Sequence, residues 1–233
     1  MNEQLEKLLI IVPYRDREEH LVAFIPHITQ KLQEQNIQDF KIIIVEQNED
    51  KLFNRGLLCN IGFQLYNEFD YYIFHDVDMI CDQIDYSYCD HPTSLLRQRS
   101  KNNFEQMYDN YFGGITLFPK NDFIRINGFN NNYWGWGAED DDLFYRCKVF
   151  DLKTSFKQGK CLDLENDIED VKRKNNPNYK NNLDLFLQIK QTADINEVKK
   201  YILFNGLKQS EHFCKINFTK KYEYYILTNV KTK

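Results

Sequence analysis

The first third of the chain alternates apolar runs with segments of helical periodicity, and this alternation limits the fold more than any other feature. Three nearly continuous apolar runs are typical of strands buried on both faces: Leu8–Val12, Lys41–Val45 and Tyr71–Phe74. Between them, residues 18–35 and 54–67 place apolar side chains at helical spacing. The order strand–helix–strand–helix–strand predicts an α/β fold with a central, mostly parallel sheet.

The remaining two thirds of the chain carry weaker signals. Pro26 falls inside the first predicted helix and predicts a kink or a break there, and residues 83–111 follow no regular pattern. Beyond them we expect a strand at residues 113–118 and helices at residues 122–127 and 143–150, with a Gly- and Trp-rich loop between the helices. A polar mobile loop at residues 163–182 and a C-terminal strand at residues 222–230 would follow. Because the sequence shows no internal repeat and no linker, we predict one domain over residues 1–233.

Composition argues against several functions. The net charge of −5 includes no basic excess, which disfavours non-specific nucleic-acid binding. The charged start and the short apolar run at residues 8–12 fit neither a signal peptide nor a membrane span or anchor. The six cysteines form no Cys-x-x-Cys pair and no recognisable disulfide framework. We therefore expect free thiols and a cytoplasmic protein, or one of another reducing compartment.

The most informative short pattern is Asp76-Val77-Asp78, directly after the third predicted strand. Ligands of α/β sheets bind beyond the carboxyl ends of the strands, where these two carboxylates would lie. Mn²⁺ and Mg²⁺ prefer carboxylate and phosphate oxygens, so the pair predicts a divalent cation that a nucleotide diphosphate would also bind. A solvated loop is the alternative for so short a pattern.

A second pattern runs from Trp134 through Gly135, Trp136 and Gly137 to the four acids Glu139–Asp142. Aromatic faces form platforms for sugars, and the glycines permit a hinged loop. A carboxylate beside such a platform can act as general base on a sugar hydroxyl. The other interpretation is an acidic helix N-terminus, which suits the helix dipole. The two are compatible, since one acid can cap the helix while another faces the site.

Two further segments combine arginine with an aromatic residue. Arg15 and Arg17, after the first strand, can meet a nucleotide or its phosphates, although a surface turn is the simpler alternative. Phe53 and Arg55, at the start of the second predicted helix, can stack on a base and contact phosphate. Their alternative is an ordinary helix start with a packed phenylalanine.

In combination these segments resemble the β-1,4-galactosyltransferase family, whose fold is the Rossmann-like GT-A type. Five family patterns occur in order. They are Pro-aromatic-Arg-x-Arg-x-x-His at residues 13–20, Phe-Asn-Arg with Asn-x-Gly-Phe at 53–63, and Asp-Val-Asp at 76–78. Tyr-Phe-Gly-Gly follows at 111–114, and the long Trp-Gly-Trp-Gly signature at 127–142. Only Ala138 departs notably from the long signature. The resemblance covers nearly the whole chain. It implies inverting, metal-dependent transfer of galactose from UDP-galactose to a sugar hydroxyl of a glycan or glycoconjugate.

The resemblance also implies roles for individual residues. Donor contacts fall on Pro13, Arg15, Arg17, Phe53, Arg55, Asp76, Val77 and Trp136, the last on a mobile loop that closes over the donor. The catalytic acids are Glu139, Asp140 and Asp141, with Asp140 as general base. Acceptor contacts fall on Tyr108, Tyr111, Gly114, Trp136, Asp140 and Asp141. Residues 1–82 would form a nucleotide-binding half, and residues 83–233 an acceptor-binding half with mobile loops.

The identity of the donor sugar depends on Tyr111 in this resemblance. Tyrosine at its position accompanies galactose donors, because a bulky ring fills the space that an N-acetyl group needs. We expect galactose, with glucose and N-acetylgalactosamine as alternatives. An alternative of another class is a carbohydrate- or nucleotide-sugar-binding protein with weak catalysis.

The expected metal ligands depart from the family pattern. The resemblance implies Asp78 as a direct ligand of Mn²⁺, or of Mg²⁺, with Asp76 as its companion. The family's histidine ligand has no counterpart in residues 159–177. Alternative alignments place Asp163 or Glu169 near a ligand position, and oxygen ligands would favour the harder ions.

Overall fold

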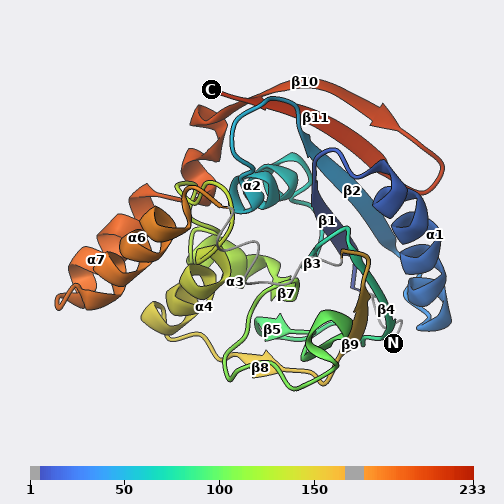
Figure 1. Ribbon diagram of the computed structural model, residues 1–233, viewed down its shortest axis with the longest axis horizontal. Coiled ribbons are helices and arrows are strands. Elements are labelled where there is room, and N and C mark those ends of the chain that lie inside the picture. The colour runs from blue at the N-terminus through green and yellow to red at the C-terminus, as the bar shows by residue number, and fades with distance from the viewer. Residues whose placement is uncertain (1–5, 166–175) are drawn as a thin grey trace.

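A central sheet forms the core of the structure, and helices cover both of its faces (Figure 1). The computed structural model describes residues 6–165 and 176–233. The strands of this sheet are β1 (Leu8–Tyr14), β2 (Phe40–Gln47), β3 (Tyr71–His75), β5 (Thr93–Ser94), β7 (Ile115–Pro119), β8 (Ser155–Phe156), β10 (Cys214–Lys221) and β11 (Ile226–Thr232). Their order is β10-β11-β2-β1-β3-β7-β5-β8. The helices are α1 (Glu18–Glu34), α2 (Arg55–Leu65), α3 (Lys120–Arg125), α4 (Glu139–Val149), α6 (Tyr179–Gln191) and α7 (Ile195–Phe204), with short 3₁₀ turns η1 (Ser100–Asn102) and η2 (Leu207–His212).

β1 lies in the middle of the sheet, and all seven of its residues are buried. It pairs in parallel with β2 and with β3, so that Ile10 lies opposite both Ile42 and Ile73. Alternate side chains enter different cores, because Ile10 packs in the core that contains α1 and Ile11 in the core that contains α2. β11 adds in parallel to β2, whereas β7 runs antiparallel to β3. The predicted α/β class and the mostly parallel sheet are confirmed.

Helix α1 continues through Pro26, so the predicted break, one of the two alternatives, is wrong. Proline removes one N–H, which would have bonded the carbonyl of Val22 in the preceding turn. The side chain of Val22 is 68% exposed, so water can reach this turn and replace the lost donor. Burial of Phe24, Ile28 and Leu32 holds the helix against the sheet.

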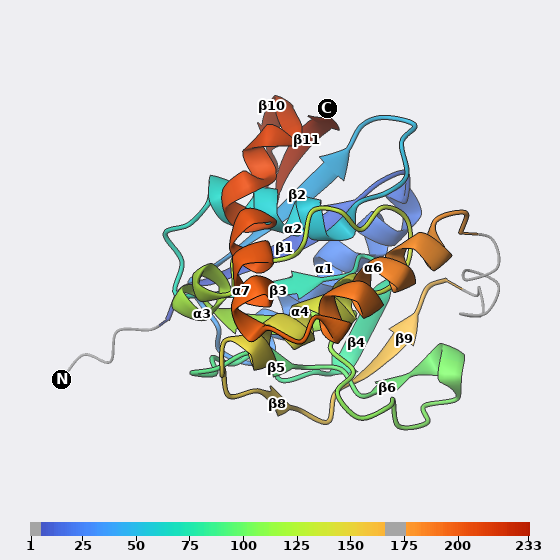
Figure 2. The same ribbon diagram turned by 90° about the vertical axis from the view of Figure 1, so that its left-hand side faces the viewer.

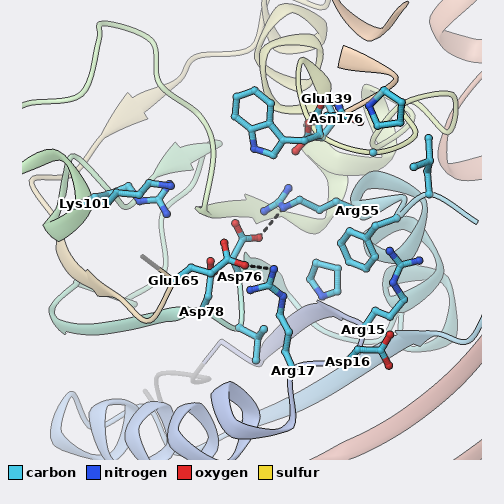
Figure 3. A pocket seen from close by; sticks show the side chains of 18 residues that line it. Arg15, Asp16, Arg17, Arg55, Asp76, Asp78, Lys101, Glu139, Glu165 and Asn176 are labelled. Carbon is cyan, nitrogen blue, oxygen red and sulfur yellow. Dashed lines mark hydrogen bonds and ion pairs between the residues drawn. The ribbon is translucent and has the colours of Figure 1, made fainter. Parts of the chain in front are cut away.

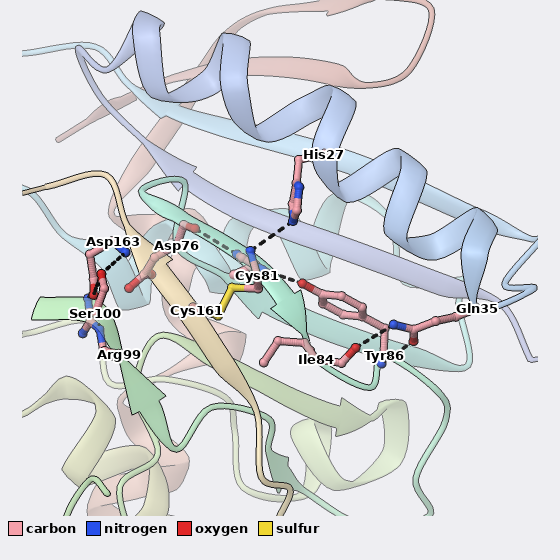
Figure 4. Close-up of a disulfide and its surroundings, with 11 residues drawn as sticks. His27, Gln35, Asp76, Cys81, Ile84, Tyr86, Arg99, Ser100, Cys161 and Asp163 are labelled. Atoms are coloured by element: carbon pink, nitrogen blue, oxygen red, sulfur yellow. Dashed lines mark hydrogen bonds and ion pairs between the residues drawn. A yellow bond between two sulfur atoms is a disulfide. The ribbon is translucent and has the colours of Figure 1, made fainter. Parts of the chain in front are cut away.

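A smaller sheet lies beside the main one, in the order β4 (Met79–Gln83), β9 (Lys160–Asp163) and β6 (Gln98–Arg99). β4 and β9 are antiparallel neighbours, and a disulfide joins Cys81 to Cys161 across them (Figure 4). The prediction of free thiols is therefore wrong for this pair, and it holds for Cys59, Cys89, Cys147 and Cys214. Because 80 residues separate the bonded cysteines, only the strand pairing reveals their proximity. The expected reducing compartment loses the support that it drew from free thiols.

Several elements extend beyond or differ from their predicted ranges. α4 begins at Glu139 rather than at residue 143, because all four consecutive acids belong to its first turn. α6 begins at Tyr179, inside the predicted loop 163–182, of which residues 166–175 lie outside the described part of the chain. The predicted C-terminal strand is the second arm of a hairpin, β10 with β11. α6 and α7 pack against α4 through a small apolar cluster (Figure 2).

Among residues 6–165 and 176–233, we find no helix with the length and apolar character needed to cross a bilayer.

Arg146 connects α4 to two distant segments although its side chain is fully buried. Its Nε donates to Asp142 Oδ2 at 2.7 Å, one turn earlier in the same helix. Its Nη1 donates to the carbonyl of Gly128 at 3.0 Å, after α3, and its Nη2 to the carbonyl of Asn205 at 2.8 Å, after α7. The guanidinium therefore fixes α4 relative to both segments, and with it the acids at the start of α4.

We expect Arg146→Met to destabilise the protein by about 3–5 kcal/mol, because it leaves the buried Asp142 carboxylate without its counter-ion. The free energy of unfolding is measured by urea denaturation. Lys148→Met, an exposed position on the same helix, is the matched control and should change stability by less than about 0.5 kcal/mol. A loss below about 1 kcal/mol for Arg146→Met would contradict the role of this ion pair.

The disulfide makes a prediction about thiol chemistry. In denaturant without a reductant, an alkylating reagent should modify four of the six cysteines, and after reduction it should modify all six. Mass spectrometry of the intact protein counts the added groups. Cys81→Ser should show five modified cysteines even before reduction, because it releases Cys161. Six modified cysteines in the unreduced wild-type protein would refute the disulfide.

Candidate functional site

A cavity of about 670 Å³ opens beyond the carboxyl ends of β1 and β3 (Figure 3). Sheets with parallel strands present ligand sites at this end. Its walls bring together segments that are far apart in the sequence, namely Pro13, Arg15, Asp16, Arg17, Leu52, Phe53, Arg55, Asp76, Val77, Asp78, Arg99, Lys101, Gly135, Trp136, Glu139, Glu165, Asn176 and Pro177. All eight residues predicted to contact the donor line this one cavity, as does the predicted metal ligand Asp78.

An ion pair between Arg55 and Asp76 lies at the back of this cavity. Arg55 Nε donates to Asp76 Oδ1 at 2.7 Å. Burial would raise the pKa of the Asp76 carboxyl, but the charge of Arg55 and its hydrogen bond outweigh that effect and lower the pKa below its usual value. Burial lowers the pKa of the neighbouring His75 to about 4, so this imidazole is neutral near pH 7. The positive charge beside Asp76 therefore comes from arginine.

The Arg55 segment is positioned by the cap of α2. Asn54 accepts a hydrogen bond from the backbone N–H of Leu57 at 2.9 Å, which is the usual geometry of a helix N-cap. Its side-chain amide also donates to the carbonyl of Asn131 at 2.8 Å. The start of α2 is thereby linked to the Gly- and Trp-rich segment that precedes α4.

Asp78 and Asp163 lie in different environments, although both were predicted near the metal. Asp78 lines the cavity. The Asp163 carboxylate is 1% exposed and pairs with Arg99, whose Nε donates at 2.8 Å (Figure 4). It also accepts from the backbone N–H of Lys101 at 3.2 Å. Asp163 is thus committed to protein donors rather than to the cavity, and the alternative Glu169 lies outside the described residues.

The two arginines that follow β1 line the larger cavity. The Arg15 guanidinium lies 5.5 Å from the ring centroid of Phe53, and its Nη1 donates to the carbonyl of Lys51 at 2.5 Å. Arg17 forms an ion pair with Glu165 across the cavity (Figure 3). The sequence did not single out Glu165, because its acidic character is unremarkable in a polar segment.

A second cavity of about 130 Å³ adjoins the first and reaches the start of α4. The residues that line both are Arg55, Asp76, Arg99, Lys101, Trp136 and Glu139. The second cavity is further lined by Tyr108, Tyr111, Gly114, Gly137, Ala138, Asp140, Asp141, Tyr179 and Leu183. Every residue predicted to contact the acceptor is therefore found here.

The acids of α4 differ in environment. Asp142 is buried and paired with Arg146, which fits the predicted division of the acids between structure and site. Burial, reinforced by the charges of Glu139 and Asp141, raises the pKa of Asp140 well above the usual value for aspartate. The carboxylate form, which accepts a proton, is lost as the pH falls through this raised pKa. Such a perturbed carboxyl in a cleft is typical of a general base.

Gly113 allows Asp140 and Tyr111 to approach each other. A Cβ atom at Gly113 would overlap Oδ2 of Asp140 and lie 3.1 Å from the ring of Tyr111. The Tyr111 ring is therefore adjacent to the acid that was predicted as the base. Tyr108 packs edge-to-face on Tyr111 at 5.4 Å between centroids, and its hydroxyl donates to Asp141 Oδ1 at 3.3 Å.

The Gly- and Trp-rich segment carries Trp136 to the junction of the two cavities. Gly135 and Gly137 have φ angles of 79° and 110°, which residues with a side chain rarely adopt. Ala138 adopts φ 70° just before α4. The rings of Trp136 and Tyr179 lie 5.6 Å apart, so α6 contributes to this wall. Tyr179 was missed because its surroundings in the sequence are polar.

Family models match two consecutive parts of the chain. One, described as the N-terminal region of glycosyl transferase group 7, matches residues 3–90. The other, described as the N-terminal domain of galactosyltransferase, matches residues 93–169. Between them they include every residue that lines either cavity except Asn176, Pro177, Tyr179 and Leu183.

Individual relatives agree with these matches. Human β-1,4-galactosyltransferase 4 is 41% identical over 156 residues, which is 65% of this chain and 45% of that protein. The chain thus spans less than half the length of this curated relative. The crystal structure of the catalytic domain of Drosophila β-1,4-galactosyltransferase 7 with xylobiose superposes with a TM-score of 0.75 at 27% identity, over 98% of this chain and 95% of that one. A mutant of that Drosophila protein, in complex with manganese, UDP-galactose and xylobiose, matches with the same score, identity and coverage.

Proposed function

We propose that this chain, which belongs to the β-1,4-galactosyltransferase family, transfers galactose from UDP-galactose to a hydroxyl group of a sugar acceptor. The GT-A type of fold predicted from the sequence is confirmed by the likeness to solved glycosyltransferases. The observation that carries the proposal is the pair of adjoining cavities. One contains the predicted nucleotide and metal residues, the other contains Asp140, and both share the Trp136 wall.

The larger cavity supports the donor part of the proposal. Arg15, Arg17 and Arg55 line it with positive charge, which suits a diphosphate. Phe53 offers an aromatic face in the same cavity. On binding, a diphosphate would compete with Glu165 for Arg17, so the ion pair between them would open as the donor enters.

The metal part of the proposal depends on Asp78. Its carboxylate oxygens are suitable donors for Mn²⁺ or Mg²⁺, and Asp76 lies two residues away in the same cavity. No three His, Cys, Asp or Glu side chains within residues 6–165 and 176–233 are grouped to hold an ion. Asp78 would therefore hold the cation with the help of Asp76 and of donor oxygens. When bound, such a cation neutralises the charge of departing UDP.

The chemical step assigned to this chain's own residues is proton removal by Asp140. Its Oδ1 accepts from the backbone N–H of Asp141 at 3.0 Å, which fixes the carboxylate, while Oδ2 faces Gly113 and the Tyr111 ring. An acceptor hydroxyl in the smaller cavity would lose its proton to Oδ2 as it attacks the anomeric carbon opposite UDP. Glu139 and Asp141, on either side, would bind sugar hydroxyl groups. The product has inverted configuration.

A donor panel tests the proposed function. With Mn²⁺ present and a mixture of simple sugar acceptors, UDP release should be fastest from UDP-galactose, because the Tyr111 ring occupies the space that an acetamide needs. UDP-glucose and UDP-N-acetylgalactosamine are the competing donors, and omission of the metal is the control. If UDP release is faster from either competitor, the sugar of that competitor, and not galactose, is the donor sugar. Donor binding in calorimetry without any turnover would identify a binding protein instead.

The Asp140→Asn variant tests the assigned base. We expect its kcat to fall by about 10²–10⁴, because asparagine cannot accept the proton, while the affinity for UDP changes little. Steady-state kinetics and calorimetry measure the two effects. Asp142→Asn is unsuitable as a control because that carboxylate pairs with the buried Arg146, so Asp184→Asn on α6 serves. Full activity of Asp140→Asn would refute the assignment.

A further inference from the structure

Arg99 is a buried cation at the boundary between the two cavities, and the sequence patterns assign it no role. It ends the short strand β6, and it is 6% exposed although it lines both cavities. A guanidinium buried to this extent needs partners that satisfy its charge and its donors.

One side of the Arg99 guanidinium faces Asp163. Nε donates to Asp163 Oδ1 at 2.8 Å, and Nη2 donates to the same oxygen (Figure 4). The other oxygen, Oδ2, accepts from Ser100 Oγ at 3.3 Å and from the backbone N–H of Lys101 at 3.2 Å. Asp163 itself ends β9, which the Cys81–Cys161 disulfide ties to β4. The guanidinium is therefore attached to a rigid part of the fold.

The other side of the guanidinium faces the substrate cavities. Arg99 Nη1 donates to the hydroxyl oxygen of Tyr111 at 3.3 Å. Tyr111 is 5% exposed, and the remainder of its ring lies against Tyr108 and beside Gly113. The phenol is thus held at its hydroxyl by Arg99 and at its ring by the edge-to-face contact with Tyr108.

We propose that Arg99 is a positioning residue that sets the selectivity for the donor sugar by holding the Tyr111 ring in place. The inference rests on the proposed function, in which this ring excludes an N-acetyl group. A ring blocks the acetamide only while it stays in position, since rotation about its side-chain bonds would open the space. The rigid anchor through Asp163 supplies this restraint. The substrate class that Arg99 rejects is therefore the N-acetylhexosamine nucleotides.

A purely structural role is the competing explanation, because the Arg99–Asp163 pair also joins β6 to β9. The two explanations differ in one measurable quantity. A structural role changes stability and lowers activity with all donors alike, whereas a positioning role changes the ratio between donors. The ratio of kcat/KM for UDP-N-acetylgalactosamine to that for UDP-galactose is therefore the decisive readout.

Three variants isolate the contact. Arg99→Lys keeps the charge for Asp163, but a single ammonium cannot also reach the Tyr111 hydroxyl with the geometry of the planar guanidinium. Tyr111→Phe keeps the ring and removes only the hydroxyl. Each change should raise the donor ratio by about tenfold. The double variant Arg99→Lys/Tyr111→Phe should raise it no further than either single change, because both remove the same contact.

Arg97→Lys is the matched control. Arg97 is equally buried and comes from the same segment, but its guanidinium donates to the carbonyls of Met107 and Tyr108 rather than to Tyr111. Its donor ratio should stay within about twofold of the wild-type value. Thermal unfolding of each variant establishes that the protein compared is folded.

The outcomes are separable from those of the proposed function. Unchanged ratios for folded Arg99→Lys and Tyr111→Phe, or additive effects in the double variant, overturn the positioning role while galactose transfer by the wild type stands. If the wild type transfers from no UDP-sugar, the proposed function fails. The ratio of the dissociation constants of the same two donors, measured by calorimetry on the same variants, then decides the inference by the same criteria.

Discussion

The buried ion pair between Arg146 and Asp142 is the interaction on which the geometry of the site depends. The pair lies inside α4, and the remaining donors of Arg146 reach the carbonyls that follow α3 and α7. Desolvating two charges is costly unless every donor is satisfied, and here the carbonyls satisfy donors that Asp142 does not reach. The first turn of α4, which carries Asp140, is therefore placed by contacts made one turn later in the helix. Asp142, one of the four acids in the first turn of α4, thus holds the helix in position.

Much of the fold could be predicted because its signals are local. β1, β2 and β3 are continuous apolar runs, and burial on both faces produces that pattern directly. Part of the larger cavity was likewise predictable, since Asp76 and Arg15 follow strands and strand ends converge in such folds. α7 was missed although Ile195, Val198 and Ile202 keep helical spacing, because polar and charged residues surround them in the sequence.

The remaining features could not be predicted because they depend on contacts between distant segments. Cys81 and Cys161 become neighbours only when β9 pairs with β4. Whether Asp163 faces a cation or an arginine depends on Arg99, which approaches it from a strand 64 residues earlier. An acid close to an expected ligand position is consistent with either partner. The three-dimensional structure decides between the two partners, because a buried guanidinium without a carboxylate is costly, whereas a solvent-open cavity can do without one.

The same contacts explain how the two cavities can act as one site. The smaller sheet joins β4, which follows Asp78, to β9 and β6, which carry Asp163 and Arg99. Arg99 in turn meets Tyr111, whose ring lies beside the catalytic candidate Asp140. A continuous set of strand pairings, hydrogen bonds and packing contacts thus leads from the expected metal residue to the expected base. The predicted division into a nucleotide-binding and an acceptor-binding half, at residue 82, would be bridged by this sheet. A displacement of β9 would consequently alter both cavities together. The geometry of the donor part and that of the acceptor part thus depend on the same structural element.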